Sequence, residues 1–134
     1  MRLELRLLKR KFKFFFQRLI RGFDDSETWD LADTYYRWLE PGLKRFKEVT
    51  FAYPMRCKSM DKWKKELDKR CKQLQEINTI EDFEFSDWSY IPKKDFVKLM
   101  KKGIPNSTLC ATAKEYAIQD FNKWFYKNVN ELWW

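Results

Sequence analysis

The sequence predicts an all-α fold, because apolar residues recur at spacings of three and four through most of the chain and turn-forming residues are scarce. Only three glycines and four prolines occur in 134 residues, too few for the many turns of a β-sandwich or barrel. Hydrophobic residues make up 44% of the chain, enough for one compact core. We therefore expect one domain over residues 1–134, a helical bundle of about four to six helices.

The first predicted helix runs from Leu3 to about Arg21 and is followed by Gly22, a residue typical of helix ends. Its apolar residues share one face, which we expect to belong to the core. These residues are Leu5, Leu8, Phe12, Phe15, Leu19 and Phe23.

The second predicted helix starts near Ser26 or Thr28 and continues through a proline at position 41. Asp24 and Asp25 precede it, where carboxylates can accept hydrogen bonds from free backbone amides. A proline in a helix interior removes one backbone hydrogen bond and clashes with the preceding turn, at a cost of about 3 kcal/mol. We therefore expect a kink or break at Pro41.

Three further helical stretches are predicted. A third helix covers about Ser59 to Asn78 and is capped by Ser59, and a short helix has Pro92 in its first turn. The last helix begins near Ser107 or Thr108, whereas residues 79–91 break the rhythm and indicate an ordered loop.

Most tryptophans fall on apolar stripes, so core packing is expected for Trp29, Trp38, Trp63, Trp88 and Trp124. Exposure is expected for Trp133 and Trp134 at the chain end.

The inventory of reactive side chains argues against an enzyme. The chain has no histidine, the commonest general base and metal ligand, and no glycine-rich phosphate loop or nucleophile elbow. Cys57, Cys71 and Cys110 lack the spacing of a zinc site and fit small buried hydrophobes. The paired carboxylates fit helix capping or an acidic loop better than a catalytic cleft. We predict no catalysis, no cofactor and no metal.

No apolar run approaches the length of about 18 residues that a membrane span requires. The amino-terminal residues alternate arginine with leucine, which does not resemble a secretory signal. An odd number of cysteines is typical of reduced thiols in a cytosol. The expected location is therefore the cytoplasm of a bacterial host cell, a host that the resemblance described below implies.

Positive charge is concentrated at the amino-terminal end of the chain. Residues 1–21 hold eight basic residues and the single acid Glu4, a net +7, while the whole chain carries +8. The remaining residues therefore contribute only +1. A patch this concentrated is typical of contact with an anionic neighbour, whereas an evenly basic surface only favours solubility.

One stretch, GFDDSETWDLADTYYRWLEPGLKRFKEV from Gly22 to Val49, resembles a block found in small phage and prophage proteins, many from gut Bacteroidetes phages. Weaker likenesses extend over roughly residues 10–75 and 115–134. The resemblance implies a phage origin and an accessory role in infection, and it carries no activity and no catalytic residues. The matching positions are Gly22, Asp24, Asp25, Ser26, Glu27, Thr28, Trp29, Leu31, Pro41, Leu43, Lys44, Arg45, Phe46, Lys47 and Glu48.

The leading hypothesis is an inhibitor of a host nucleic-acid-processing complex, resembling an anti-CRISPR protein, that contacts RNA or a guide-loaded ribonucleoprotein. A basic helix with interleaved aromatics suits phosphate contacts and stacking on exposed bases. The residues assigned to this contact are Arg2, Arg6, Lys9, Arg10, Lys13, Arg18, Arg21, Lys44, Arg45 and Lys47.

Two alternatives stay open. The same helix can serve a protein–protein or assembly module without nucleic acid, including a homo-oligomer, and Phe14 points away from the apolar face in a way that suits such a contact. A basic amphipathic helix can also lie on an anionic membrane. We rank the membrane lowest, because the apolar face is expected to be needed for the core.

Overall fold

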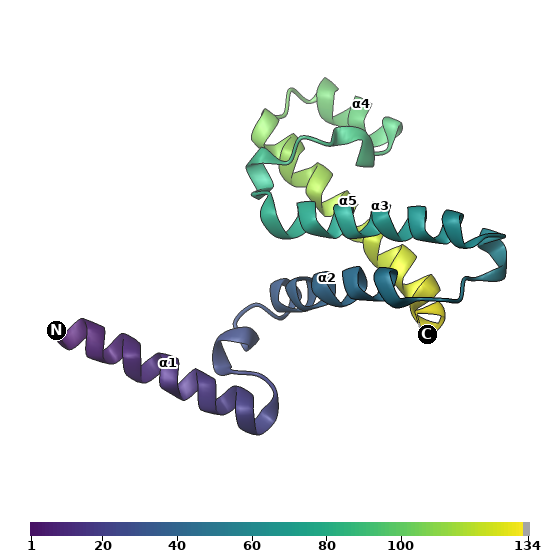
Figure 1. The fold of residues 1–134 in the computed structure, drawn as a ribbon. Helices are drawn as coiled ribbons and strands as arrows, with labels where there is room; N and C mark the ends of the chain where they lie inside the picture. Colours follow the sequence, from purple (N-terminus) through teal and green to yellow (C-terminus); the bar gives the residue numbers. More distant parts are fainter. Residues whose placement is uncertain (133–134) are drawn as a thin grey trace. The chain divides into compact units, whose positions relative to one another are not determined.

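The computed structural model describes residues 1–132 and confirms an all-α helical bundle: this part of the chain contains five α-helices, five short 3₁₀ turns and no strand (Figure 1). Contacts divide the chain into two compact units, Met1–Trp38 and Leu39–Trp134. The division falls inside a helix, and each unit is described by itself. The expectation of one domain over residues 1–134 stays a prediction. The predictions for Trp133 and Trp134 lie outside the described residues.

The first unit is built from a long helix and a turn that folds back on it. Helix α1 (Arg2–Arg21) ends at Gly22, whose φ of 80° is left-handed and whose amide donates to the carbonyl of Arg18 at 2.9 Å. Glycine adopts this conformation without steric cost, and the chain reverses there into the 3₁₀ turn η1 (Asp25–Thr28). Asp24 caps the turn, so its predicted capping role is confirmed, although the element that it caps is not the second α-helix.

Helix α2 (Leu31–Val49) begins later than predicted, because residues 25–28 form the 3₁₀ turn instead. Its start is marked by Asp30, whose Oδ1 accepts a hydrogen bond from the Asp33 amide at 3.0 Å. Pro41 lies inside the helix and does not end it, so the helix is not broken there and the kink stays a prediction. Leu39 and Leu43, four residues apart on one face, are buried.

The second unit is organised around helices α3 (Met60–Thr79) and α5 (Asn106–Asn128), which run in opposite directions and cross (Figure 1). Trp63 lies beside Trp124 with ring centroids 6.3 Å apart, and Gln73 Nε2 donates to the carbonyl of Ala117 at 2.8 Å. Ser59 caps α3 as predicted. The core side chains between the helices include Trp63, Leu67, Leu74, Ala113, Ala117 and Phe121.

The ordered loop predicted over residues 79–91 consists of two 3₁₀ turns, η3 (Asp82–Glu84) and η4 (Trp88–Tyr90), that pack on α5. Phe85 and Ile91 are buried and anchor this segment. Helix α4 (Lys93–Lys101) follows immediately after Pro92 and is tied to α5 by the hydroxyl of Tyr116, which donates to Asp95 at 2.7 Å. The remaining turns are η2 (Met55–Cys57) and η5 (Val129–Glu131).

Two predictions about the core are wrong. No residue of α1 is buried, and the stripe expected in the core is between 55% and 66% exposed at Leu5, Leu8, Phe12, Phe15 and Leu19. The reason lies in the first unit, where the returning turn packs on a different side of the helix. Trp29 and Trp38 are each 71% exposed, whereas Trp63 and Trp124 are buried as expected.

Candidate anion-binding face of the first helix

The basic residues of α1 occupy more than one side of the helix. With 3.6 residues per turn, Arg2, Arg6, Lys9, Arg10 and Lys13 fall within an arc of about 100°, and Gln17 continues this side toward the carboxyl end. Arg18 and Arg21 lie further round, toward Phe14. The turn η1 packs against the carboxyl-terminal part of this surface, and the turn and its N-cap residue Asp24 together carry three acids.

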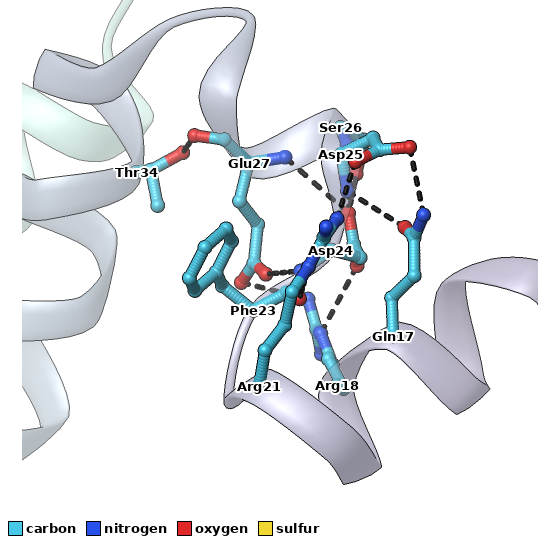
Figure 2. A network of polar contacts seen from close by, with 9 residues as sticks. All are labelled: Gln17, Arg18, Arg21, Phe23, Asp24, Asp25, Ser26, Glu27 and Thr34. Atoms are coloured by element: carbon cyan, nitrogen blue, oxygen red, sulfur yellow. Dashed lines mark hydrogen bonds and ion pairs between the residues drawn. The ribbon is translucent and has the colours of Figure 1, made fainter.

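Arg18 joins α1 to two of these acids. Its Nε lies 3.1 Å from Asp24 Oδ2, and its Nη2 lies 2.9 Å from Glu27 Oε1 (Figure 2). Asp24 is 4% exposed, while Glu27 also accepts the Asp24 amide at 2.7 Å and thereby closes a capping box. The hydroxyl and amide of Ser26 stabilise the Asp24 carboxylate, which lowers the pKa of Asp24. Arg18 therefore serves the fold of this turn.

Asp25 collects the other contacts from α1. Its carboxylate accepts a hydrogen bond from Gln17 Nε2 at 2.7 Å and pairs with the Arg21 guanidinium (Figure 2). It also lies 3.1 Å from Lys13 Nζ. Together the Gln17 amide, Lys13 and Arg21 lower the pKa of Asp25 to about 2. The Arg21 guanidinium also stands 4.9 Å from the centroid of the Phe23 ring. Lys13, Arg18 and Arg21 are thus balanced by acids of their own unit.

Five basic residues of α1 have no acid partner within residues 1–132, namely Lys11 and four residues that share another side of the helix. Within residues 1–132, no ion pair or side-chain hydrogen bond joins Arg2, Arg6, Lys9 or Arg10 to an acid, and all four are exposed. They lie on one side of the helix over about 12 Å of its length. We call these four residues the free cationic row. The row is the part of the predicted site that the structure leaves open to a partner.

The second basic cluster, on α2, belongs to the other unit and is mostly paired. Lys47 Nζ lies 2.5 Å from Asp68 Oδ1, a contact that raises the pKa of Lys47, and Arg45 lies 3.1 Å from Glu48. Lys44 has no acid partner within the described residues and borders a pocket of about 230 Å³ that Asp68 also lines. This cluster is less cationic than its sequence indicates.

The second unit has a polar depression of about 510 Å³ between α3 and α5. Arg56 donates two hydrogen bonds to Glu66, at 2.9 and 2.8 Å, and Trp124 Nε1 donates to the same carboxylate at 2.6 Å. Arg56, and then Trp124, lower the pKa of Glu66 against the opposing effect of burial. The carboxylate that this pocket contains therefore holds neighbouring elements together.

Other candidate chemistry is sparse in the part of the chain that the structure covers. Residues 1–132 contain no group of three or more potential metal ligands, and none of their helices combines the length and apolar character that a bilayer crossing requires. Cys57 and Cys110 are buried, as expected for small hydrophobes, while Cys71 is half-buried. Burial raises the pKa of the Cys57 and Cys71 thiols.

Fold and site together describe a small all-α protein with one segregated cationic row and one uncovered apolar face on the same helix. No family model matches the chain, and no curated protein or solved structure shows significant similarity to it.

The internal ion pairs of α1 were missed in the sequence, although one signal for them was present. Arg21 and Asp25 stand four residues apart, a spacing that suits an ion pair on a continuous helix. Gly22 ends the helix between them, and the pairing survives because the turn brings Asp25 back toward α1. A short linker with glycine, followed by acids and preceded by arginines, is the pattern that could have indicated this fold-back.

Proposed function

We propose that this chain is a non-catalytic, phage-encoded accessory protein that binds RNA or a guide-loaded ribonucleoprotein of a host defence complex through the free cationic row. The observation that carries the proposal is the absence of an internal acid partner for Arg2, Arg6, Lys9 and Arg10 within residues 1–132. By contrast, three exposed arginines further along the chain, Arg37, Arg45 and Arg56, each pair with an acid. A row left unbalanced suits phosphate groups that arrive with a partner.

The ion pairs that Lys13, Arg18 and Arg21 make within the chain reduce the number of residues that are free to contact RNA. Lys13, Arg18 and Arg21 can approach a phosphate only in competition with Asp24, Asp25 and Glu27, so their contribution to affinity is smaller. Phosphates neutralised by four cations give a slope of log K against log salt of about −0.7 per contact on a single strand, or about −3 in total. Affinity then falls about fiftyfold between 50 and 200 mM salt.

The proposal is tested by fluorescence anisotropy with a labelled single-stranded RNA over a salt series. Reversing two row charges in Arg6→Glu/Arg10→Glu is expected to abolish measurable binding. The matched control is Lys94→Glu/Lys98→Glu, which reverses two exposed charges at the same spacing on α4. Equal affinity of the row variant and the wild type, or binding that ignores salt, contradicts the proposal.

The host complex is sought by affinity pull-down from a Bacteroidetes lysate with and without nuclease treatment. Capture that disappears with nuclease supports an RNA-dependent contact. Capture that survives nuclease supports the alternative of a protein–protein module, which the exposed apolar face of α1 favours. Phe14 is not a suitable probe for that alternative, because it is half-buried and its ring stands edge-on to Trp29 at 6.1 Å.

A further inference from the structure

The apolar face of α1 is the largest feature of the first unit that RNA binding does not use. Its large side chains are all more than half exposed, and within residues 1–132 none of α1 is buried. We call this set the apolar stripe. It consists of Leu5, Leu8, Phe12, Phe15, Phe16 and Leu19.

The apolar stripe is continuous and well separated from the turn. Its six side chains fall within an arc of about 100° and extend over about 21 Å of the helix. Gln17, Phe14 and Arg21, which contact η1 or its flanking residues, are centred about 180° from the stripe. The unit thus folds its turn onto the far side of α1, where Gln17 and Arg21 meet it (Figure 2), and leaves the stripe exposed to water.

Cations border the stripe on both edges. Lys9 follows Phe16 on one edge and opens the arc of the free cationic row, while Lys11 stands near Phe15 on the other edge, beside the single acid Glu4. An apolar face of leucine and phenylalanine with a strongly basic polar face is typical of helices that lie in the interface of an anionic bilayer.

We propose that α1 binds the surface of an anionic lipid bilayer, with the apolar stripe among the upper acyl chains and the bordering cations at the headgroups. An anionic bilayer can contact the apolar stripe and the bordering cations at the same time, because its acyl chains are apolar and its headgroups carry negative charge. A second copy of the chain covers the apolar stripe alone, since it brings its own free cationic row of four unpaired residues toward the first. RNA offers no apolar surface that would cover leucine side chains. This inference is independent of the RNA proposal.

The test is flotation of the full chain with two kinds of vesicle, one of phosphatidylcholine alone and one of equal parts phosphatidylcholine and phosphatidylglycerol. We expect flotation with the anionic vesicles at low salt, at least about tenfold weaker partition to neutral vesicles, and weakening in high salt. No flotation with anionic vesicles overturns the proposal.

Substitutions separate apolar insertion from simple charge attraction. Phe12→Ser/Phe15→Ser is expected to lower partition into anionic vesicles at least about tenfold. The variant lacks the two large apolar side chains whose transfer from water into the bilayer favours binding. The matched control is Phe51→Ser/Phe83→Ser, at two phenylalanines that are 72% and 60% exposed in the other unit. Circular dichroism checks that both variants keep their helix content. Unchanged flotation of the stripe variant shows attraction by charge alone and overturns the inserted stripe.

Other occupants of the stripe give distinct results. Light scattering that shows a dimer in the wild type and a monomer in Phe12→Ser/Phe15→Ser, without flotation, assigns the stripe to a second copy and overturns the lipid proposal. The same stripe variant is expected to keep its RNA affinity. RNA binding can therefore fail while flotation succeeds, and the reverse, so each proposal stands on its own measurement.

Discussion

Gln17 and Asp25 hold each other through two hydrogen bonds of opposite direction, one donated by α1 to the turn and one donated by the turn to α1. Gln17 Nε2 donates to the Asp25 carboxylate at 2.7 Å, and the Asp25 backbone amide donates to Gln17 Oε1 at 2.9 Å. One side-chain amide thus satisfies both a charged oxygen and a backbone donor of the turn. We expect the fold-back that occupies one side of α1, and so leaves the apolar stripe open, to depend on this exchange.

Replacing Gln17 tests that dependence. In Gln17→Ala both hydrogen bonds are lost, at a cost of about 1 kcal/mol to the local closure of the turn. Amide hydrogen exchange at Asp25 is then expected to become about fivefold faster, while exchange in the second unit is unchanged. Gln119→Ala, at an exposed glutamine of α5, is the control and should alter neither region. Equal exchange rates in Gln17→Ala and the wild type would show that the ion pairs alone close the turn.

Acid is expected to open the same turn. The pKa of Asp25 is lowered from 3.8 to about 2 by Gln17, Lys13 and Arg21, so the folded state favours the charged carboxylate. A lowered pKa in the folded state contributes stability above pH 3.8, and this contribution is lost as the pH falls through about 2. The Asp25 carboxyl carbon should titrate near pH 2 by NMR. Gln17→Ala should move that titration upward toward 3.8.

Periodicity and capping residues were sufficient to predict most helices. Ser59 marks the start of α3, and the three-and-four spacing of apolar residues follows both α3 and α5. Periodicity failed at α1, because an amphipathic stripe indicates which face avoids water without indicating what covers it. Burial in the core and exposure at a docking surface produce the same pattern. Whether the stripe is buried or exposed depends on where η1 folds back, and that position rests on side-chain contacts of Gln17 and Arg18.

For a related reason, the net charge of residues 1–21 overestimated the charge that α1 leaves free for a partner. The sum over residues 1–21 stops at the helix, whereas Asp24, Asp25 and Glu27 lie just beyond it and return to it in space. The row that stays free is the part of α1 furthest from Gly22 along the chain. A reversal near one end of a charged helix therefore divides its cations into a paired group and a free group.

Glu66 is expected to contribute more to stability than an ordinary surface acid. In Glu66→Ala the Arg56 guanidinium loses two hydrogen bonds, and the buried Trp124 indole loses its acceptor. An unsatisfied buried donor costs about 1–3 kcal/mol, which should appear as a lower urea midpoint with an unchanged slope. Glu48→Ala removes an exposed pair with Arg45 and should cost less than about 1 kcal/mol. Equal effects of the two substitutions would contradict this role.

Pro41 is expected to be costly for the helix that contains it. Its ring nitrogen cannot donate to the carbonyl of Arg37, so Pro41→Ala restores that hydrogen bond. After allowance for the greater freedom of the unfolded alanine chain, unfolding free energy should rise by about 1–2 kcal/mol. Pro92→Ala is the control, because that proline precedes α4 and interrupts no helix. A decrease in Pro41→Ala would show that the fold requires the proline's own geometry.

Arg10 and Arg18 offer the sharpest separation of binding from folding within α1. Arg10→Gln and Arg18→Gln each remove one positive charge from the same helix, so nonspecific attraction falls equally in both. Arg10 belongs to the free cationic row, and its loss should reduce the magnitude of the salt slope for RNA binding by about 0.7. Arg18 bridges Asp24 and Glu27, so its loss should make amide exchange over residues 24–28 severalfold faster.

The expected result is a crossed pattern, since Arg10→Gln should leave exchange in the turn unchanged and Arg18→Gln should leave the salt slope unchanged. Equal reductions of the slope would show that Arg18 exchanges its carboxylates for phosphates when RNA binds. That outcome would extend the contact surface toward Gly22, because the acids released from Arg18 would have to leave α1 as well. A slope altered by neither substitution would remove the free cationic row as the contact and leave Arg18 with its structural role.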